Sequence, residues 1–186
     1  KTSIMQEINE SALRQWFDIF KSHNPLVEIM LLGGKKTASG YFTDIDTLVR
    51  EITPYTQDKR TQWNCYFVMN SLHPDCHKRE QQNCIKTWTT QTSTDNDVIG
   101  RDWILVDIDC NRIAGVSATR QEATYAHAKG EQVENFLLSQ GFNQPVKVFS
   151  GSGIHLYLKC ALACTDSNDK LVKDFLLALD MLFSDA

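Results

Sequence analysis

Two carboxylates stand at a position in this sequence that suits metal chemistry. Asp107 and Asp109 follow the apolar run Trp103 to Val106, which is typical of a buried strand. Side chains alternate along a strand, so both carboxylates should project from one face, with Cα atoms about 6.6 Å apart. Oxygens at that separation can converge on one hard cation or share two. The alternative is a pair of solvated aspartates at a strand end.

A second group of polar residues lies on a short turn and the strand that follows it. Ser150, Gly151, Ser152 and Gly153 form a turn whose hydroxyls and backbone N–H groups suit phosphate oxygens. In the strand, alternation predicts an apolar face of Ile154, Leu156 and Leu158 and a polar face of His155, Tyr157 and Lys159. If this strand neighbours the aspartate strand, one cleft holds both groups. A common turn and a structural histidine are the alternatives.

Two other kinds of site were considered and are not supported by spacing. A zinc site would use Cys76, His77 and Cys84, with Cys65 or His73, but no C-x-x-C pair is present. A hydrolase would pair Ser152 with His155, without a third residue that spacing can identify. The six cysteines are expected to be reduced thiols.

Composition bounds the class of protein. A chain of 186 residues holds one domain or two small modules, and its net charge of −4 argues against nucleic-acid binding by bulk attraction. Contacts to nucleic acid would then be local, at some of seven basic positions. The alternative is that these side chains are solvated charges on the surface. No run reaches the roughly 18 apolar residues of a membrane span, so a cytoplasmic protein is expected. The basic positions are Lys35, Lys36, Arg60, Lys78, Arg79, Arg101 and Arg112.

The first part of the chain, residues 1–95, is predicted to form an α/β module. Asn9 or Ser11 would cap a helix, and Val27 to Phe42 would form a hairpin around two glycines. Residues 64–70 predict a further strand. The polar stretch 71–97 predicts a long surface loop, and a module boundary is placed near residue 95.

The second part, residues 96–186, has the order strand, helix, strand, strand, helix. Thr119 and Glu122 fit a capping box, Gly141 should end that helix, and Ser167 should cap the last one. The last helix would carry its apolar residues from Leu171 to Leu182. This order predicts an α+β fold, a ferredoxin-like or RNA-recognition-like α/β sandwich without its final strand.

The strings DWILVDIDCNRIAGVSATRQE and VKVFSGSGIHLYLK resemble the archaeo-eukaryotic primase superfamily. They are similar to primase-polymerase (prim-pol) domains of plasmids, phages and CRISPR-associated loci, whose core has an acidic DxD strand and an sxH hairpin strand. The resemblance covers residues 97–186, and is looser in RQWF, ASGYFTD and CYFVMN. It implies an RNA-recognition-like catalytic core with the N-terminal α/β module packed against it.

The resemblance also implies roles for residues. Asp107 and Asp109 would bind Mg²⁺ or Mn²⁺, and Ser150, Ser152 and His155 would contact the triphosphate of the incoming nucleotide. The activity would be template-directed nucleotidyl transfer by a DNA primase/polymerase, with a template/primer and dNTP or NTP as partners. Fused helicase, reverse transcriptase or other domains are expected outside this chain.

Two alternatives and one departure accompany this interpretation. SGSGIHLY is also similar to the polymerase domain of bacterial end-joining ligases, and a non-catalytic RNA-recognition-like module would bind nucleic acid by stacking bases on aromatic side chains. The family has a further aspartate on a strand after the last helix. Asp180 is predicted to lie within that helix and Asp185 is next to the last residue, so a truncated chain is expected.

Overall fold

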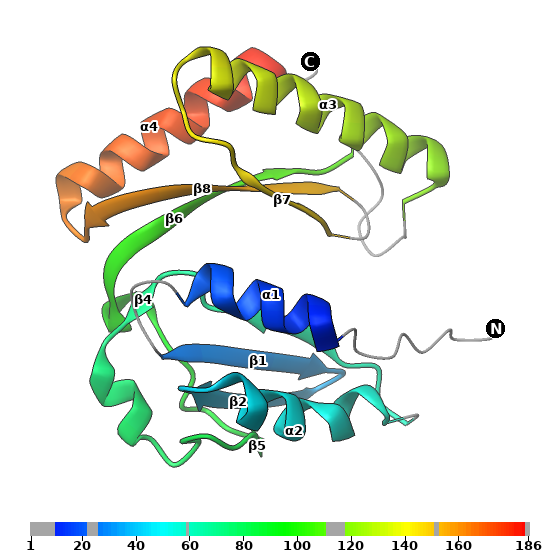
Figure 1. Ribbon diagram of the computed structural model, residues 1–186, viewed down its shortest axis with the longest axis vertical. Coiled ribbons are helices and arrows are strands. Elements are labelled where there is room, and N and C mark those ends of the chain that lie inside the picture. Colours follow the sequence, from blue (N-terminus) through cyan, green and yellow to red (C-terminus); the bar gives the residue numbers. More distant parts are fainter. Residues whose placement is uncertain (1–9, 22–25, 59, 111–117, 151–152, 185–186) are drawn as a thin grey trace. The chain divides into compact units, whose positions relative to one another are not determined.

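The protein is a mixed α+β structure, as the sequence predicts, and its strands form two antiparallel sheets (Figure 1). Its contacts divide the chain into two units, residues 1–100 and 101–186, whereas the sequence placed a boundary near residue 95. Each unit has its own core. The computed structural model describes residues 10–21, 26–58, 60–110, 118–150 and 153–184.

The sheet of the first unit has the strand order β3-β1-β2-β5. The predicted hairpin is confirmed: β1 (Val27–Gly33) pairs with β2 (Lys36–Phe42) in antiparallel register. Gly34 in its turn has a φ of 61°, a left-handed conformation that glycine adopts without a steric penalty. The outer strands are β3 (Asn64–Phe67), beside β1, and β5 (Lys86–Thr87), beside β2.

Helices α1 (Glu10–Phe20) and α2 (Ile45–Thr56) bury one apolar side each in the core of this unit. Sequence analysis predicted α1 but missed α2, because Pro54 and three threonines weaken its helical pattern. Asp44 begins α2 by accepting a hydrogen bond from the Thr47 backbone N–H at 2.8 Å. The buried core residues are Phe17, Val27, Ile29, Leu31, Ala38, Phe42, Leu48 and Ile52.

The stretch from residue 71 to 97 was predicted to be a long surface loop, and this prediction was wrong in part. It contains β4 (Ser71–Leu72), the 3-10 turns η1 (Pro74–Lys78) and η2 (Asp95–Asp97), and β5. Its Leu72, Cys76 and Gln81 are buried. Apolar residues are too sparse here for a periodic signal, so the sequence alone did not reveal this packing.

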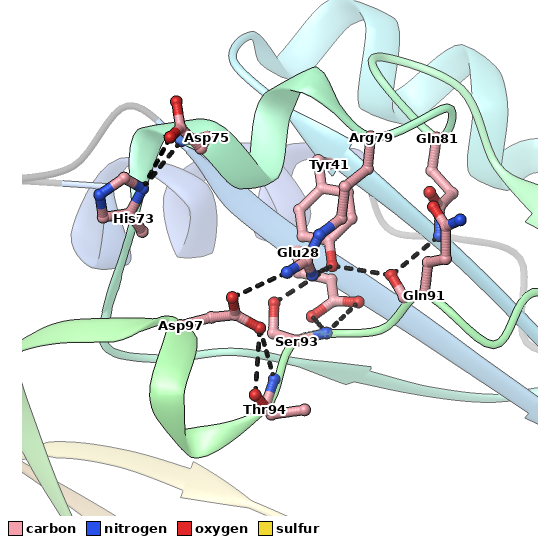
Figure 2. A network of polar contacts seen from close by, with 10 residues as sticks. All are labelled: Glu28, Tyr41, His73, Asp75, Arg79, Gln81, Gln91, Ser93, Thr94 and Asp97. Atoms are coloured by element: carbon pink, nitrogen blue, oxygen red, sulfur yellow. Dashed lines mark hydrogen bonds and ion pairs between the residues drawn. The ribbon is translucent and has the colours of Figure 1, made fainter.

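Polar contacts to the first sheet hold the later part of this stretch in place (Figure 2). The fully buried carboxylate of Glu28 accepts hydrogen bonds from the Ser39 hydroxyl at 2.6 Å and from the Ser93 backbone N–H at 3.0 Å. Arg79 donates to the Tyr41 hydroxyl at 2.7 Å and to Asp97 at 2.7 Å. A buried polar group without such partners would destabilise the fold.

The second unit follows the predicted order: β6 (Val98–Ile108), α3 (Arg120–Ser139), β7 (Val146–Phe149), β8 (Ile154–Ala163) and α4 (Asp166–Phe183). Its strands belong to a sheet of order β4-β6-β8-β7, in which β4 pairs only with the first residues of β6. Helices α3 and α4 lie on one side of β6, β8 and β7 (Figure 1).

The helices cover the apolar face of β8, as predicted. Ile154, Leu156 and Leu158 are buried in the core of the second unit, which also contains Val106 and residues of both helices. The capping box of α3 at Thr119 and Glu122 is confirmed.

Two predictions for the last helix were wrong. Thr165, not Ser167, caps α4 by accepting a hydrogen bond from the Asn168 backbone N–H. Leu171 and Leu182, expected on its apolar stripe, are 58% and 62% exposed.

Replacing Leu156 with alanine should lower the free energy of unfolding by about 2–5 kcal/mol, because a fully buried leucine leaves a cavity. Urea titration followed by circular dichroism measures this change. Leu177→Ala on α4 is the matched control, since Leu177 is exposed and its truncation should change little. Equal effects of the two substitutions would contradict the assignment of Leu156 to the core.

Asp97 should make the first unit sensitive to acid. Hydrogen bonds from the Thr94 backbone N–H and from Arg79 hold the pKa of Asp97 below its ordinary value. The unfolded chain therefore binds more protons below about pH 4, and this contribution to stability is lost as pH falls through the folded pKa. Asp97→Asn should lower stability at pH 7 and flatten the acid limb of an unfolding curve measured against pH.

Asp95→Asn is the control for that measurement, because it removes an exposed carboxylate two residues away and leaves the Arg79 contact intact. An acid limb unchanged by Asp97→Asn would contradict the role assigned to the Arg79–Asp97 pair.

Candidate functional site

The two predicted metal ligands lie where β6 ends. Asp107 is the next-to-last residue of the strand, and Asp109 follows its last residue, Ile108. The Asp107 side chain is 60% exposed. One oxygen of Asp109 accepts a hydrogen bond from the Cys110 backbone N–H at 3.1 Å. Both carboxylates therefore belong to one short segment, which the packing of Val106 fixes to the core.

His155 reaches Asp107 from the neighbouring strand. The sheet places β8 beside β6, which meets the condition that the sequence left open. His155 Nε2 lies 3.3 Å from Asp107 Oδ1, and the histidine side chain is 25% exposed. The apolar neighbours of His155 in β8, Ile154 and Leu156, point into the core, so alternation directs the imidazole to the opposite face. The histidine and one predicted metal ligand thus share this face.

Tyr157 stands beside His155 on the same face of β8. Its hydroxyl lies 3.4 Å from His155 Nδ1, and the two rings meet edge to face with centroids 6.0 Å apart. Only 6% of Tyr157 is exposed. Burial raises the pKa of the Tyr157 phenol, and the negative charge of Asp107 raises it further. The phenol is therefore held in its protonated form, which can donate a hydrogen bond.

The serine turn closes the hairpin between β7 and β8. Ser150 and Gly153 are hydrogen bonded twice: Ser150 N–H donates to the Gly153 carbonyl, and Gly153 N–H donates to the Ser150 hydroxyl, each at 3.0 Å. The other two predicted nucleotide-binding residues, Gly151 and Ser152, lie outside the described residues.

Gly153 brings the hairpin into contact with the aspartate segment. A Cβ atom on Gly153 would lie 2.3 Å from the Ile108 carbonyl oxygen, closer than real Cβ atoms approach, and 3.0 Å from the Asp109 Cα, a tight contact. The backbone of β8 therefore approaches that of β6 at the point where both motifs meet. Glycine is required at this position by the close approach, and this explains one residue of the SGSG turn in physical terms.

A cavity of about 630 Å³ adjoins the aspartates within the second unit. The end of β6 lines one side, including Asp107 and Asp109, and side chains of α3 and α4 line the other. Tyr125 and Lys129 of α3 contribute to this lining, with the Lys129 ammonium 5.6 Å from the Tyr125 ring centre. Sequence analysis did not single them out, although their i, i+4 spacing puts them on one helix face.

Asp180 lies in α4, as the sequence predicts, and lines the same cavity. Among the described residues, no group of three or more histidine, cysteine, aspartate or glutamate side chains is arranged to hold a metal ion. The two predicted ligands, Asp107 and Asp109, are therefore not part of such a group in the portion of the chain that the structure describes. Asp185 lies outside that part.

The residues of the zinc alternative make other contacts. Cys76 is buried in an apolar cluster, Cys84 donates to the Glu80 carbonyl, and His77 contacts Gln82. All six cysteines are free.

Two of the seven basic residues proposed to contact nucleic acid form ion pairs within the protein: Arg79 with Asp97, and Arg101 with Asp169. Arg112 lies outside the described residues. These ion pairs leave fewer of the seven positions available for nucleic acid.

Comparison of the chain with protein-family models, with curated proteins and with solved structures gave no match. Among the helices that the structure describes, none combines the length and the apolar character needed to cross a membrane.

Replacing Gly153 with alanine should separate the two motifs, because the new methyl group would overlap the Ile108 carbonyl. We expect lower thermal stability together with displaced backbone amide resonances at Ile108 and Asp109 in a ¹⁵N–¹H NMR spectrum. Gly100→Ala is the matched control, since its Cβ would lie 3.7 Å from the nearest side-chain atom, an ordinary contact. Unshifted resonances at Asp109 in Gly153→Ala would disprove the close approach.

Proposed function

We propose that this chain carries the nucleotide-binding and metal-binding part of a nucleotidyltransferase of the primase-polymerase type. The observation that supports the proposal most directly is the junction of two sequence motifs. His155 Nε2 lies 3.3 Å from Asp107, and Gly153 is packed against Asp109. The DxD strand and the SGSGIH hairpin are 41 positions apart in sequence, counted from Asp109 to Ser150, yet they adjoin in the fold.

The chemistry of the two carboxylates fits Mg²⁺ or Mn²⁺. Both ions prefer oxygen ligands, and Mg²⁺ is commonly held by one or two carboxylates, with water and substrate phosphates completing its coordination. Asp107 and Asp109 offer such oxygens at an exposed strand end beside a cavity. A bound divalent cation would neutralise triphosphate charge and make a primer hydroxyl easier to deprotonate.

The remaining residues would orient the nucleotide. The imidazole of His155 lies next to Asp107, and the hydroxyl of Ser150 is bonded to Gly153, which packs against Asp109; both groups suit phosphate oxygens. Lys129 is a cation in the lining of the adjoining cavity and adds positive charge near the carboxylates. Catalysis in such a site would depend on positioning and electrostatics rather than on a covalent intermediate.

A non-catalytic RNA-recognition-like module is less well supported. Such a module stacks bases on exposed aromatic rings of its sheet. Trp103 and Tyr157, the aromatic residues of β6 and β8 on the face that carries His155, are 4% and 6% exposed. The Asp107 carboxylate on that face would also repel phosphates unless a cation neutralised it. Both observations favour the metal-dependent proposal, in which replication priming and end-joining repair synthesis would use the same residues.

Nucleoside triphosphate affinity should rise with divalent metal, and calorimetry of the chain with a triphosphate and Mn²⁺ measures this directly. Asp107→Asn and Asp109→Asn should each remove most of the metal-dependent part, because a neutral amide is a poorer ligand for a hard cation. Binding that is equally tight with Mn²⁺ and with a chelator would overturn the proposal.

Two further substitutions test whether the effect is specific to these two aspartates. Asp166→Asn in the first turn of α4 removes a carboxylate at another place in the same unit and should leave the metal dependence intact. Asp180→Asn tests the one further carboxylate in the cavity lining. A loss equal to that of Asp107→Asn would identify Asp180 as an additional ligand, and no change would restrict the metal site to the strand end.

A further inference from the structure

We propose that Tyr157 is a positioning residue that fixes His155 in the tautomer with its proton on Nε2. A neutral imidazole in this form presents an N–H donor on the side of Asp107, where the triphosphate would bind. The part of this inference that concerns the triphosphate rests on the proposed function. The part that concerns the tautomer rests on the contacts of His155 alone.

The two ring nitrogens of His155 face groups of different hydrogen-bonding capacity. Nε2 lies 3.3 Å from a carboxylate oxygen of Asp107, which can only accept when it is ionised. Nδ1 lies 3.4 Å from the Tyr157 hydroxyl, which can donate. A neutral imidazole has one donor and one acceptor nitrogen, so only the tautomer with the proton on Nε2 satisfies both contacts. In the other tautomer the Nε2 lone pair would face the carboxylate.

The surroundings of Tyr157 support its role as the donor. Its phenol is protonated at neutral pH, because burial raises an already high pKa. The residues of β7 that pair with Tyr157 and His155 are Val146 and Val148, whose side chains offer no hydrogen bond. Across this hairpin, the Tyr157 hydroxyl is therefore the side-chain group placed to donate to Nδ1.

Tyr157 becomes more important if Asp107 is a metal ligand. The Asp107 carboxylate would then be shared between a cation and His155, and its attraction for the Nε2 proton of His155 would weaken. Tyr157 contacts the opposite nitrogen and does not take part in that competition. It can keep the proton on Nε2 while the carboxylate binds the cation, and that N–H is then able to donate to a phosphate oxygen.

The tautomer is tested by ¹⁵N NMR of histidine side chains in the whole chain. Spectra are recorded at about pH 8.5, where an ordinary imidazole is neutral. We expect a protonated Nε2 and an Nδ1 resonance shifted by an accepted hydrogen bond. Tyr157→Phe should move Nδ1 toward the position of a nitrogen without such a bond, and Tyr66→Phe, which changes a half-exposed phenol in the first unit, should not. A proton on Nδ1, or an Nδ1 resonance that Tyr157→Phe leaves unchanged, would overturn the inference.

Triphosphate binding is measured by calorimetry with Mn²⁺ for the wild type, Tyr157→Phe, His155→Ala and the double variant. Tyr157→Phe should weaken binding about five- to tenfold, as expected for loss of one neutral hydrogen bond. In the His155→Ala background the same change should have no effect, since Tyr157 acts through the imidazole. Equal losses in both backgrounds would show a merely structural role and refute the positioning role.

The failures of the two proposals are distinguishable. A wild-type chain that binds no triphosphate, with the NMR result as expected, would refute the proposed function and leave the tautomer assignment supported. Metal-dependent triphosphate binding that Tyr157→Phe does not alter would support the proposed function and overturn the positioning role. Thermal melting of each variant separates either result from loss of the fold.

Discussion

The contact on which the candidate site depends is the close approach of two strand ends. Gly153, the residue before β8, lies against the Ile108 carbonyl and the Asp109 backbone, at a distance that excludes any side chain. This approach brings the hairpin turn, His155 and the two aspartates within one small region. A bulkier residue at position 153 would force the two strands apart, and this separation would break the 3.3 Å contact between His155 and Asp107.

A core on the other face of the same strands maintains this approach. Leu156 and Ile154 are buried beneath α3 and α4 together with Val106, while their neighbours His155 and Asp107 face the opposite way. Strand alternation therefore couples the two faces, because a slip of one residue would exchange the apolar and polar sets. The apolar face fixes the register, and the register fixes which polar side chains meet.

The parts of the structure that could be predicted from the sequence are those with a regular residue pattern. Patterns that depend on neighbouring residues can be recognised in a single sequence. Examples are the alternation in β8, the apolar run of β6 and the capping box of α3. The packing of residues 71–97 depends instead on contacts such as Arg79 with Tyr41, which are distant in the chain. The helical pattern of α2 is weakened by Pro54 and three threonines. The pairing of Tyr157 with His155 depends on side-chain orientation, which spacing suggests but does not establish.

Two acidic residues in this chain show how surroundings separate structure from reactivity. Glu28 is fully buried, and its carboxyl oxygens accept hydrogen bonds from the Ser39 hydroxyl and the Ser93 N–H, so these contacts hold parts of the first unit together. The Asp107 side chain is 60% exposed, and the His155 imidazole lies 3.3 Å from it. A carboxylate surrounded by fixed donors would lose them on binding a cation, whereas the exposed carboxylate of Asp107 has oxygens open to solvent. This difference in surroundings, rather than acidity alone, is the reason that we propose the strand end, and not Glu28, as the metal site.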